Sequence, residues 1–244
     1  MDRAANGRLT VGIIGGMGPE ATAAFLHTLI RRTPATRDQD HLHLLVDCDP
    51  GMPDRTRAIL GDGESPVPRL VRSAEWLQSG GAELLAMPCV TVHAFLGELR
   101  AAARVPVLSI VEETARWIRA RHPDVRRVGL LATDGTLKAG VFAPLGACFD
   151  LLAPDDAAQR GVMAAVYGPS GVKTLGPNEA ASRLLERAAA QLVGAGSEVI
   201  VAGCTEIPLA LAQDAVSVPL VDTLDVLAEA VVRESLRAEA PGSE

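Results

Sequence analysis

Two cysteines stand in closely similar surroundings in this sequence. Cys89 lies in MPCVT, where an apolar run meets a threonine, and Cys204 lies at a comparable point in AGCTE. Two thiols that flank one bound carbon could remove its proton on one face and return a proton on the other, one acting as thiolate and one as thiol. Free cysteine has a pKa of about 8.5, so activation must come from helix N-termini or from neighbours such as Thr91 and Thr205. For either cysteine alone, a buried and unreactive side chain is the common alternative.

Strand and helix signals alternate along the chain and indicate how these residues are positioned. A buried strand over residues 11–14 is followed by a glycine turn and by a helix that begins near Pro19, a position that proline favours. Similar strand and helix patterns follow, and two of the strands run into Cys89 and Cys204. This alternation predicts an α/β fold with parallel sheets covered on both faces. Ligands of such sheets bind at the carboxyl ends of the strands, where we expect both thiols.

Three motifs recur in the same order and at nearly constant spacing. The matched positions are Val11 with Val128, Cys89 with Cys204, and Val105 with Val218. We therefore predict two similar parallel-sheet lobes related by a pseudo-twofold axis, with the active site in the cleft between them. The first lobe is expected to comprise residues 1–107 plus 219–244, and the second residues 108–218. The last strand and helix of each half would then cross to the other lobe.

The composition is that of an ordinary globular protein, with 48% hydrophobic and 22% charged residues among 244. The net charge of −7 argues against a nucleic-acid partner, which would need a basic surface. No run approaches the roughly 18 apolar residues of a membrane span, and the first residues lack the apolar core of a signal peptide. Four cysteines without CxxC pairs favour free thiols in a reducing compartment. We expect a cytoplasmic protein that acts on a small molecule, without nucleic-acid or membrane partners.

Several longer stretches resemble one known family. They are IGGMGPEAT (14–22), RDQDH (37–41), PDRT (53–56), PCVTVHAF (88–95), VYGPSGVK (166–173) and AGCTE (202–206). With them the chain resembles the cofactor-independent aspartate racemases of the aspartate/glutamate racemase superfamily, over about residues 9–235. The resemblance implies a two-base proton transfer at Cα of a free amino acid by an isomerase that needs neither pyridoxal phosphate nor a metal. By analogy with the family, we also expect a homodimer.

The resemblance implies roles for particular residues. Cys89 and Cys204 take the places of the catalytic thiols. The residues expected to contact the substrate are Gly16, Met17, Asp47, Arg55, Val90, Thr91, Thr133, Lys173, Thr205 and Glu206. Among these, Thr91 and Thr205 correspond to residues that hold the α-carboxylate. Arg55 and Lys173 correspond to residues that grip an acidic side chain, and arginine suits bidentate carboxylate recognition.

Simpler roles remain open for some of these side chains. Arg55 could form a surface ion pair with Asp54, and Lys173 could be solvated in a glycine-rich loop. Glu206 could tune Cys204 or cap the next helix. Thr136, at the second lobe's counterpart of the glycine turn, could contact substrate or simply form the turn.

Two departures from the family pattern bear on the substrate. Val90 stands where the family has asparagine, which removes a donor and an acceptor from the pocket. DCDP replaces the usual Asn-Asn-Pro, and the carboxylates of Asp47 and Asp49 would repel an acidic substrate unless they are paired or turned away. The presence of Arg55 favours aspartate, glutamate or a related acidic amino acid. Neutral and cationic amino acids remain alternatives.

Other functions fit parts of the sequence. The segment from Gly16 to Ala21 matches the G-x-G-x-x-A fingerprint of NAD-binding oxidoreductases, but Asp47 lies farther along than the usual ~20 residues. The same fold with other chemistry, a maleate-type cis-trans isomerase or a malonate-type decarboxylase, is a second alternative. A non-catalytic ligand-binding protein is a third.

The remaining candidates receive simpler interpretations. Cys89 and His93 have a spacing that metal ligands can adopt, but packing or capping by His93 is the expected role. Cys48 is expected near the cleft without a counterpart in the other half, and Cys148 is expected to be structural.

Overall fold

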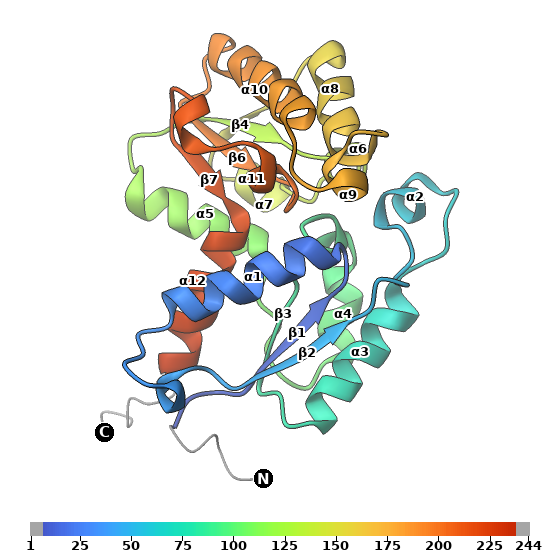
Figure 1. Ribbon diagram of the computed structural model, residues 1–244, viewed down its shortest axis with the longest axis vertical. Helices are drawn as coiled ribbons and strands as arrows, with labels where there is room; N and C mark the ends of the chain where they lie inside the picture. Colours follow the sequence, from blue (N-terminus) through green and yellow to red (C-terminus); the bar gives the residue numbers. More distant parts are fainter. Residues whose placement is uncertain (1–6, 238–244) are drawn as a thin grey trace.

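The computed structural model describes residues 7–237 and has two α/β lobes, shown in Figure 1. The first sheet has the order β2-β1-β3, and the second has the order β5-β4-β6-β7. All pairings are parallel. The strands are β1 (Val11–Gly15), β2 (Leu44–Cys48), β3 (Leu84–Ala86), β4 (Arg127–Leu131), β5 (Asp150–Leu152), β6 (Val199–Ala202) and β7 (Leu220–Asp222). The predicted α/β fold with parallel sheets in two lobes is confirmed.

The helices cover the faces of the two sheets and form the connections between strands. The α-helices are α1 (Pro19–Arg32), α2 (Arg55–Leu60), α3 (Val67–Ser79), α4 (Leu96–Ala102), α5 (Ile110–Arg121), α6 (Asp134–Lys138), α7 (Ala143–Gly146), α8 (Asp156–Tyr167), α9 (Val172–Leu175), α10 (Glu179–Gly194), α11 (Ile207–Ala210) and α12 (Thr223–Arg237). Short 3-10 turns are η1 (Asp38–Asp40), η2 (Thr91–Phe95) and η3 (Gln213–Ala215). Within the described chain, every helix is too short or too polar to span a lipid bilayer.

The two sheets repeat one topology, as the sequence motifs predict. β1 lies between β2 and β3, and β4 lies between β5 and β6. Beyond β3, Val107 forms a parallel bridge with Leu85, in the place that β7 takes beyond β6. Positions matched in the sequence repeat therefore occupy equivalent places in the two sheets.

The last helix of each half packs against the other lobe. α5 follows the bridge in the first sheet but packs on α7 of the second lobe, whereas α12 follows β7 but packs along α1 of the first (Figure 1). The predicted division assigns residues 219–244 to the first lobe. Residues 220–222 instead pair with β6 and so belong to the second sheet. The division into 1–107 plus 219–244 and 108–218 otherwise stays a prediction.

Local sequence explains the helix starts near the strand ends. Pro19 opens α1 at the position where a missing N–H costs nothing. Asp54 caps α2 by accepting a hydrogen bond of 2.8 Å from the N–H of Arg57. Thr133 caps α6 in the same way, accepting from the N–H of Thr136 at 3.3 Å. The short polar residues that follow the strands are thus held in fixed positions.

One hydrophobic cluster runs through both lobes. It contains Phe25 of α1, Ile118 of α5, Leu145 of α7 and Leu227 of α12. Further clusters lie beneath α3 in the first lobe and between α8 and α10 in the second. Because the crossed helices share the central cluster, the lobes are packed together on the side where α5 and α12 lie.

Candidate active site

Both cysteines lie just beyond the carboxyl ends of equivalent strands. Cys89 follows β3 and Cys204 follows β6, and both are free thiols. Each side chain is buried, with 4% of its surface exposed. The predicted placement of one thiol at a strand end in each lobe agrees with this arrangement, and it is the edge at which parallel sheets bind ligands.

Cys204 has a carboxylate as its nearest partner. Its Sγ donates a hydrogen bond of 3.0 Å to Oε2 of Glu206, and Thr205 Oγ1 donates to the same oxygen at 3.3 Å. The other oxygen of Glu206 forms an ion pair with the ammonium of Lys173. Burial raises the pKa of the Cys204 thiol well above its ordinary value, and the charge of Glu206 raises it further against the pull of Lys173. Cys204 is therefore a thiol in this arrangement.

Lys173 is held in the site by Glu206. Burial opposes the charge of Lys173, but the carboxylate of Glu206 is the largest of the neighbouring groups that outweigh burial and raise the pKa of the ammonium. The alternative of a solvated Lys173 does not hold, because this side chain is paired with the buried Glu206.

Arg55 is buried rather than part of a surface ion pair, since 9% of it is exposed. Its Nη1 donates to the carbonyls of Met52 (3.2 Å) and Pro53 (3.0 Å), and its Nη2 donates to that of Met17 at 3.4 Å. Nε is also buried and has no hydrogen-bond partner among residues 7–237. Burial opposes the charge of Arg55, but the neighbouring Cys89 helps to raise the pKa of the guanidinium. Arg55 is thus placed as the cation next to the first thiol.

Three threonine hydroxyls join the two lobes. Thr91 of η2 lies with its Oγ1 2.8 Å from that of Thr136 and 3.3 Å from that of Thr133, both from the α6 segment. The last two hydroxyls are 3.0 Å apart, and all three side chains are buried. Thr133 and Thr136 therefore do more than form a turn, because they hold Thr91 from across the lobe boundary.

Tyr167 is a site residue that the sequence reasoning did not single out. Its hydroxyl lies 3.4 Å from Thr56 Oγ1 in the first lobe. The ammonium of Lys173 lies 5.7 Å from the centre of its ring. Burial raises the pKa of Tyr167 to about 12, so the phenol stays protonated at neutral pH. The available signal was its place in VYGPSGVK, the stretch that also supplies Lys173.

The glycine turn after β1 is shaped by close approaches. Gly16 has φ +88°, and a Cβ there would lie 2.4 Å from the backbone of Asp49. At Gly18, a Cβ would lie 3.3 Å from Oε1 of Glu206 and 3.6 Å from Nζ of Lys173. The turn of the first lobe thus meets the ion pair of the second.

The acidic segment after β2 lies beside this turn. Asp47 is half-buried and stands opposite Ile14 in the sheet register. Asp49 is paired with Arg69, whose Nη1 lies 3.1 Å from Oδ2. One of the two carboxylates that would repel an acidic substrate is therefore neutralised.

Other expected residues have structural surroundings. Val90 is 1% exposed and belongs to the central hydrophobic cluster, while Met17 reaches the site through its carbonyl. His93 has its Nδ1 2.8 Å from the carbonyl of Cys89, and its Nε2 accepts from the N–H of Ile110 at 3.1 Å. The packing and capping role expected of His93 fits these contacts, which occupy both ring nitrogens.

The two remaining cysteines are both exposed. Cys48 ends β2. Cys148 has Arg119 Nη1 3.3 Å from its sulfur, and its structural role stays a prediction.

Comparison with known proteins agrees with this architecture. The family described as Asp/Glu/hydantoin racemase matches residues 14–231. The solved aspartate racemase of Picrophilus torridus is 28% identical, with a TM-score of 0.82, and the likeness covers 93% of this chain and 94% of that one. The broad specificity amino-acid racemase RacX of Bacillus subtilis (strain 168) is 25% identical over 230 residues, which are 91% of this chain and 96% of that protein.

A more distant structure shares the fold alone. The glutamate racemase of Francisella tularensis subsp. tularensis SCHU S4, solved in complex with D-glutamate, is 12% identical with a TM-score of 0.68 over 98% of this chain and 85% of that one. The two-lobe fold and these matches define the chain as a racemase of the α/β class. The chain belongs to the Asp/Glu/hydantoin racemase family. It is a racemase, and hence an isomerase, so its glycine turn is not that of an NAD-binding oxidoreductase.

Proposed function

We propose that this racemase inverts free amino acids without a cofactor by moving a proton between Cys89 and Cys204. The observation that carries the proposal is that two buried thiols, one from each lobe, follow equivalent strands, and that the turn after β1 meets the Lys173–Glu206 pair beside Cys204. Each thiol also has its own charged neighbour, Arg55 beside Cys89 and Glu206 beside Cys204. Two acid/base groups at equivalent strand ends of opposite lobes suit a reaction at both faces of one carbon.

In this scheme the two thiols begin in different protonation states. Cys89, beside the Arg55 cation, is the thiolate and takes the α-proton, so that an S–H bond forms as the C–H bond breaks. The electron pair left on Cα is delocalised into the α-carboxylate. Cys204, whose proton lies toward Glu206, then gives that proton to the opposite face of Cα. After the reaction Cys89 is the thiol and Cys204 is the thiolate. In the reverse direction Cys204 therefore takes the proton and Cys89 gives one.

An acidic amino acid is the proposed substrate class. Arg55 and Lys173 supply two cations from opposite lobes, and the buried Nε of Arg55 retains a free donor among the described residues. In the proposed complex, Thr91 and Thr205 hold the α-carboxylate and the turn at Gly16 forms the rim. The similarity to an aspartate racemase and to a broad specificity amino-acid racemase supports aspartate or glutamate first, with other side chains tested beside them.

The test is incubation of L- and D-aspartate and L- and D-glutamate in deuterium oxide. We expect the opposite enantiomer to appear with deuterium at Cα. Replacement of Cys89→Ala or Cys204→Ala should each lower inversion by about 100-fold or more, because either change removes one acid/base group. The exposed Cys148→Ala variant is the matched control and should retain the wild-type rate. If both active-site variants still invert the substrate, the two-thiol mechanism is wrong.

The assembly and the location stay predictions, the first from the family resemblance and the second from the four cysteines without CxxC pairs. We propose a homodimer in the cytoplasm. Sedimentation equilibrium of the purified chain measures its oligomeric state directly. A monomer at micromolar concentration would contradict the homodimer.

A further inference from the structure

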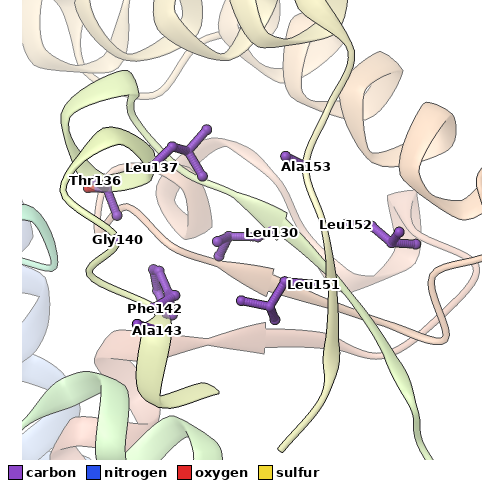
Figure 2. A pocket seen from close by; sticks show the side chains of 9 residues that line it. All are labelled: Leu130, Thr136, Leu137, Gly140, Phe142, Ala143, Leu151, Leu152 and Ala153. Atoms are coloured by element: carbon purple, nitrogen blue, oxygen red, sulfur yellow. The ribbon is translucent and has the colours of Figure 1, made fainter. Parts of the chain in front are cut away.

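A pocket of about 240 Å³ lies in the second lobe, and neither Cys89 nor Cys204 lines it. Figure 2 shows side chains from β4, β5 and the α6–α7 segment pointing into it, among them Leu130, Leu137, Phe142 and Leu151. All the side chains that line it are aliphatic or aromatic except that of Thr136. A volume of this size exceeds what a closely packed interior leaves between its side chains.

The internal repeat shows how the two lobes differ near this pocket. Leu130 of β4 corresponds to Ile13 of β1, and both belong to the hydrophobic cluster that runs through both lobes. α1 has 14 residues, whereas the helices that follow β4, α6 and α7, have 5 and 4. The shorter helices cover less of their sheet than α1 covers of the first. The pocket lies against β4 and β5 beside these shorter helices.

The lining sets the chemistry of an occupant. Among residues 7–237, no charged side chain lines the pocket, so an ionic ligand would lose its hydration without compensation. The hydroxyl of Thr136 already contacts those of Thr91 and Thr133, at 2.8 Å and 3.0 Å. The rest of the pocket surface is apolar. It favours a small uncharged molecule, because binding removes the apolar surface of that molecule from water.

One pocket wall is connected to the candidate active site. Thr136 lines the pocket and, through its hydroxyl, contacts Thr91 in the turn that follows Cys89. The neighbouring Leu137 also lines the pocket, and its N–H donates to the carbonyl of Thr133 at 3.0 Å. A molecule that displaces α6 would therefore move two of the three hydroxyls that hold Thr91.

We propose that this pocket binds a small uncharged apolar molecule, about the size of one aromatic ring, and that its occupancy acts through Thr136 and Thr91 on Cys89. Only the catalytic importance of that effect rests on the proposed function. Binding itself and the reactivity of the Cys89 thiol are measured without any substrate.

The experiment uses toluene as the probe and the full chain with 13C-labelled leucine methyl groups. Toluene should give saturable shifts of the Leu130, Leu137 and Leu151 methyl signals. Ala143 and Ala153 line the pocket, so Ala143→Phe and Ala153→Phe should each weaken binding by about tenfold or more by filling it. Ala147→Phe, on the same short helical segment but outside the lining, should bind toluene like the wild type.

Coupling is read from the rate at which iodoacetamide alkylates Cys89, followed by peptide mass analysis. Saturating toluene should change this rate by about twofold or more in the wild type and in Ala147→Phe, but not in the filled variants. Shifts that do not saturate, or equal affinity in all variants, would overturn the binding site. Saturable binding with an unchanged Cys89 rate would overturn the coupling. Because two filled variants are used, failure of one to fold still leaves the other decisive.

Discussion

The sulfur of Cys204 lies 3.0 Å from Oε2 of Glu206, whose other oxygen is paired with Lys173. Thiol, carboxylate and ammonium thus form one chain of contacts in the second lobe. Burial and the carboxylate both favour the protonated thiol, whereas the ammonium favours the thiolate. Glu206 therefore sets the balance, because it acts on Cys204 directly and also neutralises the cation in this chain of contacts.

Replacement of Glu206→Gln should lower the pKa of Cys204. The change removes a negative charge beside the sulfur and leaves the charge of Lys173 unopposed, and both effects favour the thiolate. The midpoint of Cys204 alkylation by iodoacetamide, followed against pH, should fall by about one unit or more. Glu186→Gln on the exposed face of α10 is the control. An unchanged or higher midpoint in Glu206→Gln would mean that Glu206 does not hold the proton on Cys204.

The ring of Tyr167 should matter more than its hydroxyl. The 3.4 Å contact with Thr56 is at the weak limit for a hydrogen bond between hydroxyls, whereas an ammonium 5.7 Å from a ring centre is within cation–π range. Tyr167→Phe should keep KM for the best substrate within about twofold. Tyr167→Ala should raise it by about tenfold, with a smaller effect on kcat. Equal effects of both variants would assign the role to the hydroxyl instead.

The hydroxyl link between the lobes should contribute measurable stability. Thr136→Val keeps the shape of the side chain but leaves the Thr91 hydroxyl with the longer 3.3 Å contact to Thr133. A loss of about 1 kcal/mol in the free energy of unfolding is expected from urea titration. Thr136→Ser retains the hydroxyl and should preserve the contact to Thr91, with a cost from the lost methyl group alone. If racemisation falls in Thr136→Val but not in Thr136→Ser, the hydroxyl also positions Thr91.

Sequence patterns predict those parts of this molecule that local chemistry decides. Alternating strands and helices, a repeat of three motifs and the position of each cysteine after a strand predict two parallel-sheet lobes with thiols at equivalent ends. Parallel strands are buried on both faces, so they appear as apolar runs that need no long-range information. The apolar runs of β1, β3 and β6 therefore indicate by themselves that these strands are buried, as they are.

Contacts across the lobe boundary are decided by packing of distant segments, which no pattern records. Tyr167 of the second lobe reaches Thr56 of the first because the two lobes meet there. The sequence shows which residues carry chemistry; their partners come from tertiary structure.

Two buried groups should give this protein opposing pH dependences of stability. Burial lowers the pKa of His93 to about 4 from an ordinary 6.5, and burial raises that of Asp222 to about 6 from 3.8. His93 stabilises the fold fully above its unfolded pKa of 6.5, and that stability is lost as the pH falls toward 4. Asp222 has the opposite sign, because its protonated form is favoured in the fold and stability is lost as the pH rises from 3.8 to 6. Each effect is on the order of 3 kcal/mol at most.

Between pH 4 and 6 the two effects should largely cancel in the wild type. Each single variant should show the pH dependence of stability that comes from the group it retains. Urea unfolding across this range should show His93→Gln losing stability relative to the wild type as the pH rises, since Asp222 then acts alone. Asp222→Asn should lose stability relative to the wild type as the pH falls, since the buried imidazole then acts alone and its Nε2 cannot take a proton while it accepts from the N–H of Ile110. The remaining carboxylates titrate equally in all three proteins, so the differences isolate these two groups. Parallel stability curves for the three proteins would show that neither group is held in its uncharged form.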